Sequence, residues 1–175
     1  MRRVVPLRPA RGFTLLELLV VVAIVAVLGS VGLDRFWHLQ EQAERAAMEQ
    51  SLLGLKFALR IQMAAASAAQ DPARLRRVAD GNPFDWLEER PANYAGEVSP
   101  AVPEVPPGSW MFDRGHAEVL YRARRHASLE GADGAVLRFQ LRPLDAAGRP
   151  VAQGAGFASM VLAPQGAYRW FERSF

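Results

Sequence analysis

The stretch that decides the fold is Arg11-Gly12-Phe13-Thr14-Leu15-Leu16-Glu17-Leu18-Leu19, which runs directly into Val20-Val21-Val22-Ala23-Ile24-Val25-Ala26-Val27-Leu28. Residues 13–33 are almost entirely aliphatic, and a helix of ~20 such residues crosses ~30 Å of hydrocarbon. The length therefore predicts a membrane span. Glu17 lies near its start, where an ionised carboxylate costs about 2.5–3.5 kcal/mol on insertion scales. This cost indicates a function for Glu17, and its natural partner is a cation at the same depth.

The charge that precedes the span is uniformly positive. Residues 1–12 contain no acid and four arginines, namely Arg2, Arg3, Arg8 and Arg11. The rest of the chain has 17 basic and 18 acidic side chains, so the net charge of +3 comes from these first residues. Positive residues next to a span stay in the cytoplasm. We therefore expect the N-terminus inside and the C-terminal part on the far side of the membrane.

Residues 11–33 resemble the N-terminus of the type IV pilin and type II secretion pseudopilin superfamily, in which a leader ending in glycine precedes Phe-Thr-Leu-Leu/Ile-Glu and an apolar run. The resemblance implies that a membrane prepilin peptidase cleaves after Gly12 and that the new amino group of Phe13 is methylated. It also implies that Glu17 neutralises the charged N-terminus of a neighbouring subunit during filament assembly.

Composition bears on the type of subunit. The chain has no cysteine, so an exported domain has to fold without disulfides. Many major pilins of this superfamily close a C-terminal loop with a disulfide, and the resemblance therefore implies a minor subunit or a pseudopilin. The chain departs from the family at Ala26, where glycine is frequent, and at Asp34, where a proline often ends the span with a kink. Its 175 residues allow one anchor helix and one modest domain.

Residues 34–70 continue the helical pattern, with apolar side chains at helical spacing. Polar residues near the start of this part predict a solvated portion: Gln40, Glu41, Gln42, Glu44 and Arg45. The apolar surface that follows is too wide for a solvated helix. We expect the C-terminal strands to cover this surface, which comprises Leu52, Leu53, Leu55, Phe57, Leu59, Ile61 and Met63.

Residues 71–108 predict short helices and a connector. Asp71 before Pro72 is typical of a helix start, and Asn82 before Pro83 repeats the pattern for a second short helix that reaches Glu89. Residues 90–108 are rich in proline and lack a periodic apolar pattern, which predicts a loop laid over the domain surface.

Residues 109–175 alternate between apolar and polar side chains, which predicts strands. Within residues 135–142, the side chains of Leu137, Phe139 and Leu141 share one face and should cover the helix. We predict four to five strands, at residues 110–112, 118–124, 135–142, 157–163 and 167–171.

The predicted fold class is α+β and pilin-like: one long N-terminal helix, with a transmembrane half and an amphipathic half, packed on a small antiparallel sheet. The predicted divisions are a leader at residues 1–12, a transmembrane and polymerisation helix at 13–33, its amphipathic continuation at 34–70, short helices and a connector at 71–108, and the sheet region at 109–175.

Little in the sequence indicates catalysis. The three histidines His38, His116 and His126 are too scattered to predict a metal site, and no nucleophile motif accompanies the serines. We expect no enzymatic activity, no cofactor and no metal. Two arginine clusters could contact nucleic acid, although an exposed strand face and subunit contacts use arginine equally well, so we do not expect nucleic-acid binding; the clusters are Arg74, Arg76 and Arg77, and Arg122, Arg124 and Arg125.

The resemblance thus implies a filament subunit, either a minor pseudopilin of type II secretion or a minor type IV pilin. Its expected partners are prepilin peptidase, other pilin or pseudopilin subunits and an inner-membrane assembly platform. It would be stored as a single-pass protein of the bacterial inner membrane and then enter a pilus or pseudopilus. One alternative is a Sec-exported periplasmic binding or enzymatic domain whose signal peptide is removed near residues 29–32. A lesser alternative is a pilin for DNA uptake.

Overall fold

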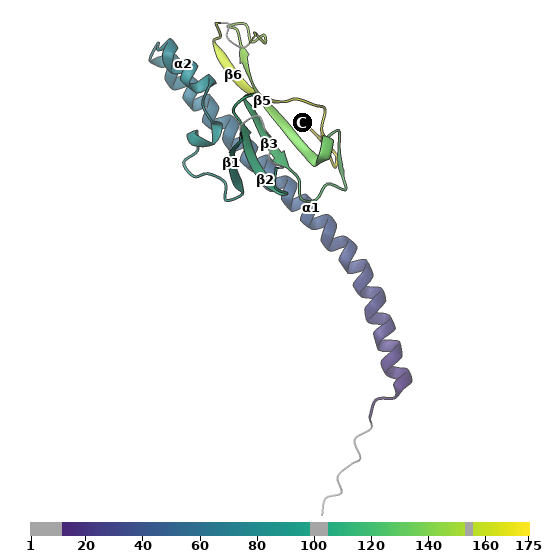
Figure 1. Cartoon of the computed structure of the whole chain (residues 1–175). Coiled ribbons are helices and arrows are strands. Elements are labelled where there is room, and N and C mark those ends of the chain that lie inside the picture. Colours follow the sequence, from purple (N-terminus) through teal and green to yellow (C-terminus); the bar gives the residue numbers. More distant parts are fainter. Residues whose placement is uncertain (1–11, 99–104, 153–155) are drawn as a thin grey trace, which may run out of the picture. The chain divides into compact units, whose positions relative to one another are not determined.

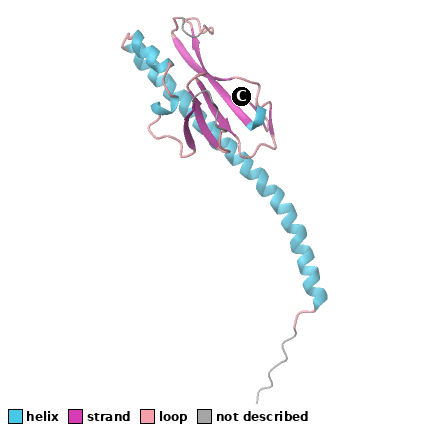
Figure 2. Ribbon diagram, in the orientation of Figure 1, coloured by secondary structure: helices cyan, strands magenta, loops and turns pink. Residues whose placement is uncertain are grey.

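The computed structural model describes residues 12–98, 105–152 and 156–175. The chain divides into two compact units, residues 1–39 and 40–175, and each is described by itself. Figure 1 traces the elements along the chain and Figure 2 separates helices from strands. The fold class is α+β and pilin-like, as predicted, because one long helix and a mainly antiparallel sheet make up the described residues.

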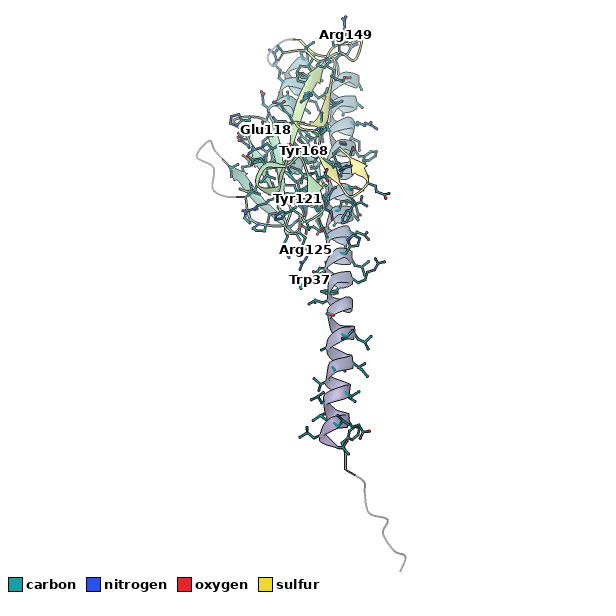
Figure 3. The ribbon with its side chains drawn as sticks, turned by 90° about the vertical axis from the view of Figure 1, so that its right-hand side faces the viewer. Trp37, Glu118, Tyr121, Arg125, Arg149 and Tyr168 are labelled. Atoms are coloured by element: carbon teal, nitrogen blue, oxygen red, sulfur yellow. The ribbon has the colours of Figure 1, made fainter. Side chains whose placement is uncertain are left out.

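Helix α1 (Leu15–Ala68) passes without interruption through both units. The positions that depart from the family, Ala26 and Asp34, both lie inside this single helix. In the first unit every apolar side chain that the structure describes between Leu15 and Leu33 is exposed. Figure 3 shows the side chains of this N-terminal segment projecting from both sides of the ribbon.

In the second unit α1 buries one face against the sheet. The residues of α1 with less than 10% exposure recur at helical spacing and include Met48, Leu52, Leu55, Leu59, Met63 and Ala66. The predicted covering of the helix by strands is therefore confirmed for one half of its apolar surface. Leu53, Phe57 and Ile61, from the other half, remain more than 50% exposed.

The main sheet has the strand order β1-β2-β3-β5-β6. Its strands are β1 (Tyr94–Val98), β2 (Ser109–Asp113), β3 (Glu118–Arg122), β5 (Val136–Leu144) and β6 (Ser159–Pro164). Strand β1 runs parallel to β2, and every other neighbouring pair is antiparallel. Leu137, Phe139 and Leu141 of β5 are at most 1% exposed, which confirms their predicted position on the covering face.

Strand β1 corrects the prediction that residues 90–108 form a connector without regular structure. Five residues between prolines carry too short a pattern to indicate a strand, and β1 exists because of tertiary contacts. Buried Asn82 donates its amide to the Tyr94 hydroxyl at 2.7 Å and to Glu97 Oε1 at 2.9 Å. These bonds fix β1 beside β2, where its register shifts between Tyr94 and Glu97.

Two valines that flank the undescribed residues 99–104 cover the outer face of the sheet. Val98 and Val105 pack against Met111 and Leu120 in a small second core. A surface loop was predicted here, and the part around Val105 does lie over the sheet. Residues 99–104, which include Pro100 and Pro103, are outside the described residues.

A second sheet of three very short strands was not predicted. It consists of β4 (Leu129–Glu130), β7 (Arg169–Trp170) and β8 (Arg173–Ser174), all antiparallel. The prediction of one strand over residues 167–171 was therefore wrong in length and in sheet. Two-residue strands leave no alternating pattern in the sequence. After β4, a 3₁₀ turn (Asp133–Ala135) leads the chain back into the main sheet at β5.

Two short helical elements follow α1. Helix α2 (Pro72–Ala79) begins as predicted, since the Asp71 carboxylate accepts from the backbone N–H groups of Ala73 and Arg74. Figure 1 shows α2 beside the C-terminal end of α1. The second predicted helix is only a 3₁₀ turn (Pro83–Trp86), which Asn82 caps by accepting from Phe84 N–H.

Candidate functional site

The first site is the start of α1, around Gly12, Phe13 and Glu17. Gly12 and Phe13 precede the helix in backbone without regular secondary structure, and Phe13 is 73% exposed. Thr14 caps the helix, because its Oγ1 accepts from the Glu17 N–H at 3.2 Å. The peptide bond after Gly12 therefore lies outside the regular helix.

The sequence held a signal for this cap that the prediction did not use. Thr14-Leu15-Leu16-Glu17 has the form of a capping box, in which the hydroxyl satisfies the third N–H of the helix and an acid follows three residues later. The carboxylate also lies in the first turn, where the helix dipole favours negative charge. Local helix chemistry thus explains an acid near this helix start.

Glu17 has no charged partner among residues 12–98, 105–152 and 156–175. Its side chain is exposed, and in the described part of the chain it makes no ion pair or hydrogen bond. The predicted site arginines Arg2, Arg3, Arg8 and Arg11 lie outside the described residues. Within the part of the chain that the structure describes, the exposed Glu17 carboxylate is therefore open to a partner on another molecule.

The helix that carries Glu17 is suited to a membrane. Over the described residues, α1 is the one helix that is long and apolar enough to cross a bilayer, and none of its most apolar segment is buried. Exposed fractions of 81% for Leu15, 62% for Val25 and 67% for Leu28 are high for a helix in water. Hydrocarbon or other helices would cover this surface.

A second feature concerns two glutamates at the beginning of the second unit. Glu41 is only 4% exposed and accepts from Ser128 N–H at 2.8 Å and from the Trp170 indole N–H at 3.0 Å. The prediction that Glu41 belongs to a solvated portion was therefore wrong. The spacing of apolar residues cannot predict that an acid is buried when its hydrogen-bond donors lie far away in the sequence.

Glu44 holds the adjacent part of the same loop. Its Oε1 accepts from Arg124 N–H at 2.6 Å and from the Tyr121 hydroxyl at 3.0 Å, and its Oε2 accepts from Arg125 N–H at 3.0 Å. Burial, together with the nearby negative charge of Glu44, raises the pKa of the Tyr121 hydroxyl. Figure 3 shows Tyr121 beside α1. The two glutamates together fasten the β3–β4 loop to the helix.

The histidines do not form a metal site within the described ranges, where no three metal-binding side chains gather. His116 instead pairs with Asp113, whose Oδ2 lies 2.7 Å from His116 Nδ1. The hydrogen bond to Asp113 raises the pKa of His116. Burial favours the neutral form of Asp113, but the hydrogen bonds from His116 and Gly115 outweigh it and lower the pKa of Asp113.

The arginine clusters make contacts within the protein. Arg77 pairs with Asp71 at 3.3 Å, and the Arg122 guanidinium donates to the Val105 carbonyl at 3.0 Å. Arg124 and Arg125 contribute their backbone N–H groups to Glu44. These contacts give the arginines structural uses that do not involve nucleic acid.

Comparison with known proteins identifies the N-terminal segment. Residues 7–33 match the family model described as the prokaryotic N-terminal methylation motif. Neither the curated proteins nor the solved structures contain a match to the chain. The matched residues include Gly12, Phe13 and Glu17 and the apolar part of α1. The matched motif contains the first, apolar part of α1, and it supports a relationship to the type IV pilin and pseudopilin family.

Proposed function

We propose that the protein is a minor filament subunit, either a minor pseudopilin of type II secretion or a minor type IV pilin. The methylation motif supports a pilin-type subunit that prepilin peptidase processes and that assembles with other pilin subunits. The absence of cysteine supports the minor type. The observation that carries the proposal is Glu17, an acid in an apolar helix whose side chain has no partner among the described residues.

In this proposal cleavage occurs between Gly12 and Phe13, and the new amino group of Phe13 becomes methylated. Removal of residues 1–12 also removes Arg2, Arg3, Arg8 and Arg11, which until then hold the N-terminus in the cytoplasm. The mature chain then spans the inner membrane once, with its C-terminal unit in the periplasm.

The amino group made by cleavage is the cation that Glu17 lacks. An ammonium and a carboxylate that are each unpaired in hydrocarbon are both costly, and one pair between neighbouring subunits relieves both costs. The assembly platform would draw subunits from the membrane when such pairs form. The exposed apolar surface of α1 would then pack against equivalent helices in the filament core.

N-terminal sequencing of the protein from cells tests the proposal directly. A mature chain that begins at Phe13, with an N-methyl group, supports it. A start near residues 30–33 would instead establish a removed signal peptide and a periplasmic domain without a membrane anchor.

The variant Glu17→Ala tests the role of the carboxylate. It should be cleaved at the normal rate, because Gly12 and Phe13 are unchanged, but should fail to enter filaments recovered from cells. Glu17→Asp is the matched control, since it keeps the charge and should assemble in part. Normal incorporation of the alanine variant would contradict the charge pairing.

A further inference from the structure

Strand β6 forms one edge of the main sheet (Figure 1), because in the described part of the chain it pairs with β5 and with no other strand. Gln165, directly after β6, donates its N–H to the Arg138 carbonyl of β5 at 2.9 Å. Residues that bond to the neighbouring strand alternate along an antiparallel pair, so every second residue of β6 before Gln165 also bonds to β5. The backbone groups of the residues between them, Met160 and Leu162, therefore point away from the sheet.

The outward backbone groups of Met160 and Leu162 have no hydrogen-bond partner among the described residues. The side chains of both residues belong to the core, and the residues are 6% and 4% exposed, so this part of the edge is held in place. Val161 lies between them on the outer face and is 39% exposed. An ordered edge with unpaired N–H and C=O groups is a template for a further strand.

A cleft of about 200 Å³ separates this edge from α1. No residue of β5 and no acidic side chain lines it. Among the described residues, neither of its two cations, Lys56 and Arg60, has an ion-pair partner. A strand added to β6 would therefore turn one of its faces toward two cations. The lining residues are Lys56, Leu59 and Arg60 of α1 and Met160, Val161 and Leu162 of β6.

The spacing of the two cations matches alternate residues of a strand. Lys56 and Arg60 are four residues apart, so they share one face of α1 and differ by about 6 Å along its axis. Every second side chain of a strand points to the same face, and two such residues lie about 6.6 Å apart. An added strand with glutamates two residues apart can thus bring one carboxylate to each cation. Cations beside an edge also disfavour pairing with strands that carry no acid.

We propose that the β6 edge is a docking site for an extended acidic segment of another protein, with the pattern Glu-x-Glu, which adds a sixth strand to the main sheet. Backbone hydrogen bonds to Met160 and Leu162 supply affinity, and the charges of Lys56 and Arg60 select the acidic segment. The inference goes beyond the proposed function, because assembly through Glu17 and α1 does not require this edge.

Peptide binding to the full-length chain in detergent, followed by fluorescence anisotropy, tests the site. The probe is the fluorescein-labelled peptide Ser-Thr-Val-Glu-Val-Glu-Val-Thr-Ser. Its matched control is the isomer Ser-Thr-Val-Val-Glu-Glu-Val-Thr-Ser, whose two acids point to opposite faces of a strand. We expect the probe to bind at least about tenfold more tightly than the isomer, since only the probe can bring both carboxylates to α1. Equal affinities would overturn the proposal.

N-methylation of the probe tests whether it binds as a strand. One version carries methyl groups on the backbone nitrogens of both glutamates, and the other carries them on the two valines that precede the glutamates. These nitrogens lie on opposite edges of an extended peptide, and only one edge bonds to β6. We expect one version to lose at least about tenfold in affinity and the other to stay within about threefold of the probe. Equal effects would contradict strand addition.

Charge reversal tests the part played by α1. Arg60→Glu should lower the affinity for the probe at least about fivefold, because it sets acid against acid. Of two peptides in which one or the other glutamate is replaced by lysine, one should restore the affinity for this variant, which a misfolded protein could not show. Arg76→Glu makes the same charge change at an exposed position outside the cleft, and should bind the probe within about twofold of the natural chain.

A second copy of this chain at the edge would overturn the proposal. The natural chain has no cysteine, so a disulfide between two Val161→Cys copies would reveal such a pair without background. Weak binding of every peptide to a folded chain would overturn it as well. None of these measurements involves Glu17 or the cleavage site, so a chain that begins at Phe13 but binds no peptide rejects this docking site and leaves the proposed function standing.

Discussion

Leu55 and Phe57 are two residues apart on α1, yet Leu55 is 0% exposed in the core and Phe57 is 66% exposed on the opposite face. The same helix therefore has two surfaces, one that holds the second unit together and one that is exposed. Similar side chains on these two surfaces should respond differently to truncation.

Leu55→Ala should lower the free energy of unfolding by about 2–5 kcal/mol, because it leaves a cavity between α1 and the sheet. Phe57→Ala should change it by less than about 0.5 kcal/mol, since its ring is 66% exposed and lies outside the core. Urea unfolding of the detergent-solubilised chain, followed by tryptophan fluorescence, measures both. Equal losses of stability would contradict the assignment of two surfaces.

Glu41→Ala should destabilise the second unit by about 2–4 kcal/mol, because it leaves the buried N–H groups of Ser128 and Trp170 without an acceptor. The environment of the Trp170 indole should change, with a shift in near-ultraviolet circular dichroism. Gln50→Ala, an exposed change on the same helix, is the control and should have little effect. A Glu41→Ala protein as stable as the natural one would show that the two donors find water instead.

The His116–Asp113 pair should give stability that depends on pH. The folded pKa of His116 is raised, so its contribution is complete below the ordinary histidine value of about 6.5 and is lost as the pH rises through the raised value. The folded pKa of Asp113 is lowered, so its contribution is complete above the ordinary aspartate value of about 3.9 and is lost as the pH falls through the lowered value.

The stability difference between the natural chain and His116→Gln should therefore be greatest between about pH 4 and pH 6.5. Denaturant unfolding at a series of pH values measures this difference, and NMR titration of the imidazole gives its pKa. His126→Gln serves as a control in an exposed loop. A difference that stays constant from pH 5 to pH 9 would contradict the pairing.

Gly131→Ala should destabilise the pairing of β4 with β7 in the small sheet. Gly131 has φ of +80°, and a Cβ atom there would lie 2.4 Å from the Ala167 carbonyl oxygen. Both the backbone strain and the clash with rigid backbone oppose the substitution, and we expect a loss of more than about 1 kcal/mol. Gly148→Ala shares the positive φ of +77° but has open space, and the smaller loss expected there isolates the effect of the clash.

The parts of the fold that could be predicted are those that local chemistry specifies. Neighbouring residues alone predict three of these parts. They are the apolar run of α1, the Asp71 cap, and the strand that contains Leu137, Phe139 and Leu141. Strand β1 and the two-residue strands β4, β7 and β8 could not be predicted, because they exist only through pairing with distant segments. Short polar segments leave no periodic pattern.

The candidate site divides in the same way. Gly12, Phe13 and Glu17 were found from residue types in fixed register, and the cap by Thr14 could have been found from its capping-box spacing. The burial of Glu41 could not, since its donors lie 87 and 129 residues further along the chain. The exposure of Phe57 beside buried Leu55 also required the sheet to be in place.

The bond between Glu41 and Trp170 has a consequence for the order of biogenesis. Glu41 lies shortly after the apolar part of α1, and Trp170 lies 129 residues further along the chain. Glu41 is therefore synthesised long before its partner. Until Trp170 has been made, the Glu41 carboxylate stays hydrated and its side of α1 stays uncovered. A chain that stops before Trp170 would leave that side of α1 bare and open to proteases, so incomplete copies should be removed before they mature.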